Sequence, residues 1–427
     1  STHAAGRALI AVHKYRENDF KPYIFLTNNY GQSWTLLTDG KNGIPADHYV
    51  KVVREDPSRK GLLYAGTEYG VWVSFDEGKN WQPFQFNLPP VSIADMAVKE
   101  KDLVLATHGR GFWILDDVSP LHSIPTTVQA EVTLFKPRDA YRNQFSGFRG
   151  AGAPDRAPNG AIFHYFIKNK IADTAAVKLS IIDPQGKVRK IYSSKPKDGE
   201  EVLRTQVGLN RLEWDLTYEG PEALSGAQFS LADMGAVKAM PGQHKLVLEY
   251  RGNKQEQALL VKKDPRWTQT DADLQAQYDL TMQVKELFNT CHATIADIRS
   301  WRSQIKDVME RSDKYKSNVA KAIKTAGDPL VKTLTEWEEK LIQTKSEVGQ
   351  DPINYPSQID DQMAYLYSIV NNQDDRPNAG CYERLEDLKK AFLPLQNQLK
   401  AFKSTEIAAF NKVLQQQGLQ LIMTKER

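Results

Sequence analysis

The sequence predicts a multidomain protein with β and α parts: a partial β-propeller, a small β-sandwich of the immunoglobulin or fibronectin III type, and a C-terminal helical bundle. Short β-branched runs fill the first 263 residues, a strand-rich unit repeats near the N-terminus, and a helical period begins at Asp271. We therefore expect four regions: the last blades of an incomplete propeller over 1–120, a linker over 121–160, the sandwich over 161–265 and the bundle over 266–427.

The first region contains short strands and no helical period. Apolar runs are bounded by Gly, Pro, Asn or Asp, which is typical of strands joined by tight turns. The runs are RALIAVHKY, PYIFLTN, YVKVVRED, LLYAGTE, GVWVSFD, DLVLATH and GFWILDD.

Two of these stretches repeat each other. LLYAGTEYGVWVSFDEG and LVLATHGRGFWILDDVS align without gaps, which places Ala65 on Ala106 and Trp72 on Trp113. A four-strand unit with a period of about 40–50 residues predicts a propeller blade. The chain starts inside a blade and has room for few blades, so we expect the N-terminal remainder of the propeller to come from the same precursor or from a second chain. Ser1 would then be a cleavage point or a boundary.

The linker and the second β region follow. Residues 121–160 lose regularity, with GFRGAGAPDRAPNG as their most turn-rich part. Strands return in AIFHYFI, VKLSIID, KVRKIYS, NRLEWDLTY, HKLVLEY and QALLVKK, with a turn signal at Asp183-Pro184-Gln185-Gly186. Alternating strands over about 100 residues predict a sandwich.

Four apolar seams at helical spacing predict the bundle. They are Leu274, Tyr278, Leu287, Phe288, Cys291, Ile295, Ile298 and Ile305; Leu330, Leu334, Trp337 and Leu341; Ile359, Met363, Leu366 and Val370; and Tyr382, Leu385, Leu388, Phe392, Leu399 and Phe402. We expect Cys291 to be a buried apolar residue of the first seam. The alternative is a disulfide between Cys291 and Cys381.

Two octapeptides match across the repeats and end in tryptophan. TNNYGQSW holds Thr27, Asn29, Gly31 and Trp34, and SFDEGKNW holds Ser74, Asp76, Gly78 and Trp81. Both resemble the Asp-box, or BNR repeat, and the resemblance implies a structural hairpin turn away from the ligand face. An Asp or Asn side chain accepts backbone N–H bonds across such a turn, and glycine supplies positive φ. We expect Asp76 and Asp116-Asp117 to hold turns, and Glu77 to be solvated.

The amino-acid sequence resembles the C-terminal part of bacterial sortilin-like BNR-repeat proteins, often labelled glycosyl hydrolases. The resemblance rests on GLLYAGTEYGVWVSFDEGKNWQPFQFNLP and DLVLATHGRGFWILDD and continues through GLNRLEWDLTYEGP and YPSQIDDQMAYLYSIV. It implies a many-bladed propeller followed by a sandwich and helices. It also implies export to the periplasm or cell surface.

Propeller geometry predicts where a ligand would bind. The turns between second and third strands share one face with the inter-blade loops, so we expect a mouth formed by Asp47, His48, Glu68, Tyr69, His108 and Arg110, with His13 and Arg16 nearby. His108 and Arg110 flank a glycine and could grip an anion or carboxylate, or Arg110 could pair with an acid of the next blade. Asp47 and His48 are adjacent in an extended run, which points them to opposite faces.

The residues favour a non-catalytic, exported binding or scaffold protein with a peptide, glycan or protein ligand. The alternative is a glycoside hydrolase of the sialidase or xyloglucanase kind, whose site is shared with missing blades and uses Glu68 or Asp47. The bundle could also serve as an assembly element. We expect no cofactor and no metal, because the histidines lack ligand spacing. The net charge of +3 gives no sign of nucleic-acid binding, and no apolar run is long enough to span a membrane.

Overall fold

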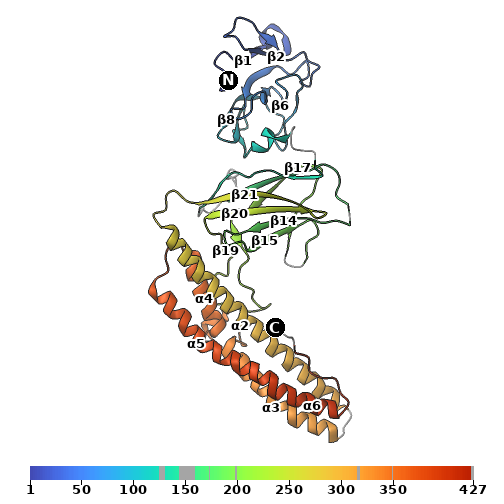
Figure 1. Cartoon of the computed structure of the whole chain (residues 1–427), viewed down its shortest axis with the longest axis vertical. Helices are drawn as coiled ribbons and strands as arrows, with labels where there is room; N and C mark the ends of the chain where they lie inside the picture. Colours follow the sequence, from blue (N-terminus) through green and yellow to red (C-terminus); the bar gives the residue numbers. More distant parts are fainter. Residues whose placement is uncertain are drawn as a thin grey trace. The chain divides into compact units, whose positions relative to one another are not determined.

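The computed structural model describes residues 1–124, 130–143, 159–172, 174–197, 200–314, 318–348 and 350–424. Strands occupy the chain up to Lys263, and a helical region follows (Figure 1). The chain divides into two compact units. The first holds Ser1–Ile182, Ile191–Asp215 and Gln243–Lys262, and the second holds Asp183–Lys190, Leu216–Gly242 and Lys263–Arg427.

The first unit opens with three antiparallel sheets whose strands lie in chain order. The first sheet is β1 (Ala8–Lys14), β2 (Asp19–Thr27) and β3 (Thr35–Leu36), with the 3-10 turn η1 (Tyr15–Glu17) between β1 and β2. The second is β4 (Val50–Glu55), β5 (Leu63–Thr67), β6 (Val71–Ser74) and β7 (Gln82–Pro83). The third is β8 (Ile93–Lys99), β9 (Asp102–Thr107) and β10 (Phe112–Leu115), followed by η2 (Ser119–His122).

The second and third sheets share one strand register. A bulge follows the first pair in both, between Val50 and Val52 and between Ile93 and Asp95. Gly66 lies opposite Val71, and Ala106 lies opposite Phe112. Gly66 therefore corresponds to Ala106, so the gapless alignment of Ala65 with Ala106 is wrong by one residue. The turn after β9 runs from Thr107 to Gly111, whereas the turn after β5 runs from Thr67 to Gly70.

Apolar side chains fill the spaces between these sheets. Trp81 is 5% exposed and packs with Ile24 of β2 and Leu63 of β5. A second cluster joins the second and third sheets through the side chains of Tyr64, Val73, Ile93, Met96 and Leu105, among others. Trp34 of the first octapeptide is 40% exposed, so the two tryptophans differ in packing. Buried and more accessible residues alternate along β9 and part of β2, whereas all residues of β5 are buried, and short apolar runs predicted both kinds of strand.

Two further sheets complete the β part. One orders β11 (Val132–Leu134), β13 (Ala161–Ile167) and β17 (Gly208–Trp214). The other orders β12 (Ala140–Arg142), β21 (Asn253–Lys263), β20 (Gly242–Tyr250), β14 (Val177–Ile182), β15 (Val188–Ser193) and β16 (Glu201–Val202). A short pair joins β18 (Thr217–Tyr218) to β19 (Val237–Lys238).

Two expectations for this part need correction. Strands β11 and β12 lie inside the predicted linker, where they join sheet edges, while residues 125–129 and 144–158 of that linker lie outside the described residues. The predicted strand NRLEWDLTY is split into β17 and β18, because Leu216 between them adopts a φ of 58°.

The second unit is mainly helical, as the seams predicted. It holds α2 (Asp271–Asp313), α3 (Asn318–Leu341), η3 (Asp351–Ile353), α4 (Ile359–Asn372) and α5 (Ala379–Phe402), which continues through the π-helical turn η4 (Lys403–Ile407) into α6 (Ala408–Gln416). Helix α2 begins behind a capping box, in which Thr270 and Asp273 bond each other's backbone N–H. It contacts α3, α4 and α5. Cys291 and Cys381 are both free and buried.

Candidate functional site

One end of the first three sheets gathers the turns that the sequence singled out. When antiparallel strands follow each other in chain order, the turns before and after any one strand lie at opposite ends of the sheet. The turns after β1, β5 and β9 therefore lie at one end, and the two octapeptide turns, which follow β2 and β6, lie at the other. We call the first of these ends the mouth, and it contains the residues described next.

Glu68 lies at the centre of the mouth and is surrounded by donors. The Tyr49 hydroxyl donates to Glu68 Oε2 at 2.8 Å, and Lys51 Nζ lies 2.6 Å from the same oxygen. Lys51 Nζ also donates to Ser92 Oγ at 2.6 Å, which links the second sheet to the start of the third. Within each of these two sheets one matching backbone bond closes the pair of strands, because Glu68 N donates to Tyr49 O in the second sheet and His108 N donates to Ser92 O in the third.

These contacts decide the charge of Glu68. Partial burial acts to raise its pKa, but hydrogen bonds from Lys51, Tyr49 and Ser92 outweigh that effect and leave the pKa below its usual value. Burial and the bond to Glu68 raise the pKa of Tyr49 to about 12. The centre of the mouth is therefore a carboxylate that stays ionised and a phenol that stays protonated at neutral pH.

Aromatic rings flank this centre. Tyr15 stacks on Tyr49 with ring centroids 5.0 Å apart, and His13 and Phe20 lie 6.4 and 6.2 Å from the same ring. The rings of His48 and Tyr69 form a second aromatic pair, with their centroids 4.5 Å apart. Phe20 is 44% exposed and Tyr69 is 52% exposed, so parts of these rings face solvent and can stack against a ligand.

The structure places the predicted site residues unevenly. His48, Glu68 and Tyr69 lie together, and His108 joins them through its backbone. His48 Nε2 is 4.0 Å from an Asp47 carboxylate whose side chain is 81% exposed. Such a pair is open to solvent and gives little activation of either group.

Arg110 and Arg16 belong to the periphery of the mouth. The carbonyl of Arg110 accepts a bond from the Trp113 indole, and over the described ranges no ion pair involves the Arg110 guanidinium. The predicted alternative, in which Arg110 pairs with an acid of the next sheet, is not seen there. Arg16 lies over the Tyr15 ring at 5.8 Å.

Sequence reasoning missed Tyr15, Tyr49, Lys51 and Ser92. Their signal is positional: Tyr49 and Ser92 each stand one residue before the first strand of a sheet. Lys51 is the extra residue of the β4 bulge. A bulge cannot be read from a single sequence, so the direction of Lys51 towards Glu68 could not be predicted.

The opposite end holds the two octapeptide turns, which share one set of bonds. Asp76 Oδ1 accepts from Ser74 Oγ and from Asn80 N, both at 2.9 Å. Asn29 Oδ1 accepts from Thr27 Oγ1 at 2.9 Å and from Ser33 N at 3.0 Å. Gly31 and Gly78 have φ values of 82° and 85°. The Asp76 carboxylate is thus occupied by its own turn.

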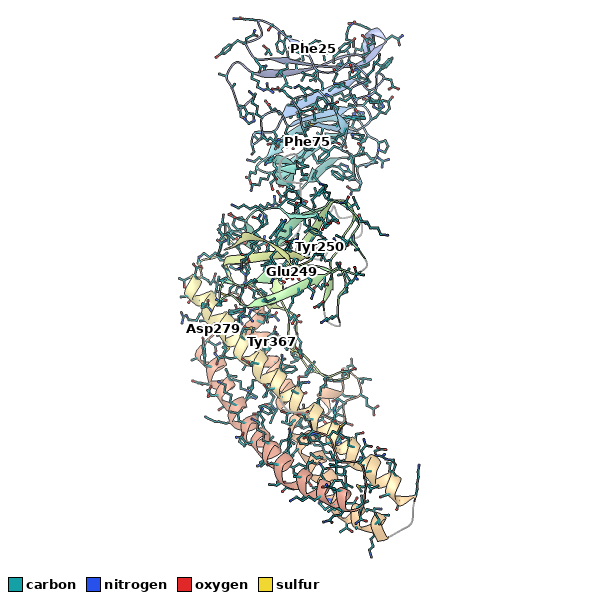
Figure 2. All side chains as sticks on the ribbon, turned by 45° about the vertical axis from the view of Figure 1, so that its right-hand side comes forward. Phe25, Phe75, Glu249, Tyr250, Asp279 and Tyr367 are labelled. Atoms are coloured by element: carbon teal, nitrogen blue, oxygen red, sulfur yellow. The ribbon has the colours of Figure 1, made fainter. Side chains whose placement is uncertain are left out.

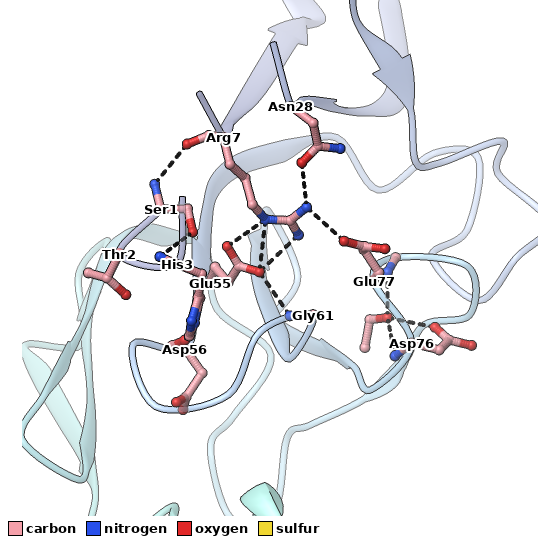
Figure 3. A network of polar contacts seen from close by, with 12 residues as sticks. Ser1, Thr2, His3, Arg7, Asn28, Glu55, Asp56, Gly61, Asp76 and Glu77 are labelled. Atoms are coloured by element: carbon pink, nitrogen blue, oxygen red, sulfur yellow. Dashed lines mark hydrogen bonds and ion pairs between the residues drawn. The ribbon is translucent and has the colours of Figure 1, made fainter. Parts of the chain in front are cut away.

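Glu77, expected to be solvated, instead belongs to a polar network (Figure 3). Arg7 Nη1 lies 2.7 Å from Glu77 Oε1 and donates to Asn28 Oδ1 at 2.8 Å, while Arg7 Nη2 lies 2.9 Å from Glu55 Oε1. Gly61 N also donates to Glu55. The Glu77 side chain is still 42% exposed, so the expectation of a solvated Glu77 missed only its ion pair, because the partner, Arg7, is distant in sequence.

The remaining candidates are structural. Asp117 is buried, has a φ of 61°, and accepts from both the backbone N–H and the hydroxyl of Ser119. Across the part of the chain that the structure describes, no cluster of three or more His, Cys, Asp or Glu side chains could hold a metal ion. No helix among those residues has the length and apolar character to cross a membrane.

Comparisons with known proteins add little to this geometry. No protein-family model and no curated protein matches the chain. One solved structure, described as the extracellular domain of a hybrid two-component system from B. thetaiotaomicron, is similar over 58% of this chain, with 12% sequence identity and a TM-score of 0.19. The match spans 29% of that protein's chain.

Proposed function

We propose that this chain is a non-catalytic binding or scaffold protein that holds a peptide, glycan or protein ligand at the mouth. The observation that carries the proposal is the bonding of Glu68. A glycosidase pairs an ionised carboxylate with a second carboxyl group that keeps its proton near neutral pH, whereas the described groups that bond Glu68 are Tyr49, Lys51 and Ser92, none of which is a carboxyl. Tyr49 and Lys51 hold Glu68 as a carboxylate, so Glu68 is suited to accept hydrogen bonds from a ligand. The exposed rings of Tyr69 and Phe20 are suited to stack against the same ligand.

We also propose that the three N-terminal sheets are successive blades of an Asp-box propeller, that the following sheets form a sandwich, and that the protein is exported like the sortilin-like proteins it resembles. The shared bulge of the second and third sheets and the matching bonds of Asn29 and Asp76 support the blade assignment. A blade repeats one strand order and one turn geometry.

The proposed partner is a polypeptide that supplies further blades. Strands β2 and β6 carry β3 and β7 on their outer edges, whereas β10 has no such neighbour among the described residues. Phe112 and Ile114 of β10 are 79% and 58% exposed. An open, apolar strand edge is the kind of surface that another strand covers. Native mass spectrometry of material purified from its natural source tests this, because a tightly associated second polypeptide with more octapeptide turns is expected.

The binding function is tested with a panel of glycans and peptides on the chain together with any such partner. The wild type and Glu68→Gln are compared, and Glu100→Gln, at a residue whose side chain is 83% exposed, is the matched control. We expect binding without turnover, weakened by Glu68→Gln and unchanged by the control. Hydrolysis of a glycan that Glu68→Gln abolishes would refute the proposal and establish the glycoside hydrolase alternative.

A further inference from the structure

The three N-terminal sheets pack face to face through a contact that occurs twice. We call the face of a sheet that packs on the sheet before it in the chain its front face, and the opposite face its back face. The first contact brings together Leu9, Ala11 and Ile24 of the first sheet and Leu63, Ala65 and Trp72 of the second. The second contact brings together Tyr64, Val71 and Val73 of the second sheet and Leu103, Leu105 and Trp113 of the third. Both contacts therefore join the back face of one sheet to the front face of the next.

A matching cross-strand pair lies on both of these front faces. Ala65 lies opposite Trp72 in the second sheet, and Leu105 lies opposite Trp113 in the third. Residues directly opposite each other on antiparallel strands point to the same face of the sheet. An aliphatic residue paired with an aromatic one thus marks the front face.

The first sheet carries the equivalent pair on the face turned away from the second sheet. Phe25 precedes the octapeptide residue Thr27 by two positions, as Trp72 precedes Ser74 in the second sheet. Phe25 lies opposite Ile10, so these two residues match the tryptophan pairs just described. The residues next to them along each strand face the second sheet, which places Ile10 and Phe25 on the front face.

The front face of the first sheet is apolar and partly exposed. The strand register places five side chains on it, namely Ile10, Val12, Tyr23, Phe25 and Leu36. Ile10 and Leu36 are 42% and 46% exposed, and the other three are half-buried. The rings of Tyr23 and Phe25 are nearly parallel, with their centroids 6.4 Å apart (Figure 2 labels Phe25). The described residues therefore leave open a face whose counterparts in the second and third sheets are covered.

The third sheet exposes the other half of the repeated contact. Phe112 and Ile114 flank Trp113 in β10, so they lie on the back face, at the positions that Val71 and Val73 hold in the second sheet. The three sheets thus present one open front face and one open back face. Exposed apolar surface of this kind marks a contact with another protein, and the repeated contact indicates that a further sheet covers it.

The two internal contacts define the surface that fits a front face. In both, an aliphatic residue stands three positions before an octapeptide: Ile24 before Thr27, and Val71 before Ser74. The third sheet carries the larger Phe112 at the matching position. A second copy of this chain is therefore the poorer fit, because added volume at a packed contact is destabilising. The fitting partner is an antiparallel sheet with Ile, Val or Leu at this position.

We propose that the front face of the first sheet binds the back face of an antiparallel sheet in another polypeptide, with an aliphatic residue three positions before an octapeptide turn. The inference rests on the blade-supplying partner proposed above and names a second surface through which that partner binds. The partner covers β10 of the third sheet and the front face of the first sheet, so one polypeptide contacts both ends of the three-sheet repeat.

The test is photo-crosslinking of the full-length chain in its natural source. The photoreactive amino acid p-benzoyl-phenylalanine replaces Phe25 in one variant, Phe112 in a second and Val202 in a control. Val202 is a 64% exposed apolar residue of β16, outside the three sheets. We expect position 25 to crosslink to a strand residue just before an octapeptide, in the same polypeptide that position 112 captures. The control should not capture that polypeptide.

A charge on the front face gives a second, quantitative measurement. Ile10→Lys should reduce the amount of the partner polypeptide that co-purifies with the chain at least tenfold, whereas Val202→Lys should leave it unchanged. Circular dichroism checks that each variant is folded, and Leu36→Lys replaces Ile10→Lys if the latter is not.

The outcomes separate this inference from the proposed function. Capture from position 112 but not from position 25 would overturn the front-face contact and leave the blade-supplying partner in place. Capture from neither position would overturn both. A crosslink from position 25 to β10 of a second copy would also overturn the inference, because the occupant would then be this chain itself.

Discussion

Arg7 and Glu55 form a bidentate ion pair whose side chains are 1% and 4% exposed, and this pair ties the first residues of the chain to β4 (Figure 3). Arg7 Nε and Nη2 both donate to the Glu55 carboxylate at 2.9–3.1 Å. Glu55 also accepts from Gly61 N, and Arg7 reaches Glu77 within the second octapeptide. One guanidinium therefore connects the N-terminal segment, strand β4 and a turn.

Replacing Arg7 by methionine should destabilise the first unit by about 3 kcal/mol, because it leaves the Glu55 carboxylate buried without a counter-charge. Urea unfolding followed by tryptophan fluorescence measures the loss. Arg54→Met is the control, since its pair with Asp95 is exposed and should cost less than about 1 kcal/mol. Equal losses in the two variants would show that burial of the pair has no energetic effect.

The Arg7–Glu55 pair also predicts a dependence of stability on pH. Burial acts to raise the pKa of Glu55, but bonds from Arg7, Ser1 and Gly61 hold it at about 2, against 4.5 for a free side chain. The stabilisation is thus fully present above pH 4.5 and is lost as the pH falls towards 2. It amounts to at most about 3 kcal/mol. Glu55→Gln should remove this contribution, so wild type and variant should converge in stability at pH 2; a constant difference would contradict the assignment.

The turn at Asp76 should tolerate asparagine better than alanine, because Asn29 holds the matching turn with its amide oxygen. Asp76→Asn should cost under about 1 kcal/mol and Asp76→Ala about 1–2 kcal/mol, since alanine leaves Asn80 N without its acceptor. Thermal unfolding of the two variants gives the comparison. If asparagine is as costly as alanine, the charge of Asp76 matters and the turn interpretation is incomplete.

Two glycines with nearly equal φ allow the cost of backbone strain to be measured apart from the cost of a steric clash. Gly78 and Gly109 have φ values of 85° and 87°. A Cβ on Gly78 would lie 2.8 Å from Leu37 Cδ1, whereas nothing lies within 4 Å of one on Gly109. Gly109→Ala should cost about 1 kcal/mol from backbone strain alone, and Gly78→Ala should cost more. Chemical unfolding of both variants measures the difference, and equal costs would show that Leu37 moves aside freely.

Removing the Tyr49 hydroxyl should change the titration of Glu68. In Tyr49→Phe the carboxylate loses one of its donors but keeps Lys51, so the pKa of Glu68 should rise towards its ordinary value. Carbon-13 NMR of the Glu68 carboxyl across a pH series measures it. Tyr23→Phe, which removes a hydroxyl that donates to Asp19 elsewhere in the first sheet, should leave Glu68 unchanged.

The sequence predicted those features that depend on local pattern. The strand over Val177–Ile182 and the seam from Leu274 to Ile305 follow from alternation and helical spacing, because burial of one face imposes that pattern. The break at Leu216 was missed, since a single residue with positive φ leaves the apolar pattern on either side intact.

The site was predictable in place but not in contacts. Turn order and repeat period located Glu68 and His48 at one end of the sheets. The partners of Glu68 come from bulged or loop positions, Lys51 and Tyr49, whose direction depends on register. Arg7 meets Glu77 only after the chain has folded back across two sheets, which no spacing rule encodes.

The turn from Thr107 to Gly111 is one residue longer than the turn from Thr67 to Gly70, yet Trp113 and Trp72 keep the same place in their strands. The extra residue is accommodated entirely within the turn, so the pairing of the strands beneath it is unchanged. These turns are consequently natural grafting points: loops of varied length and sequence can be installed there as a library, while the strands beneath serve as an unchanging frame.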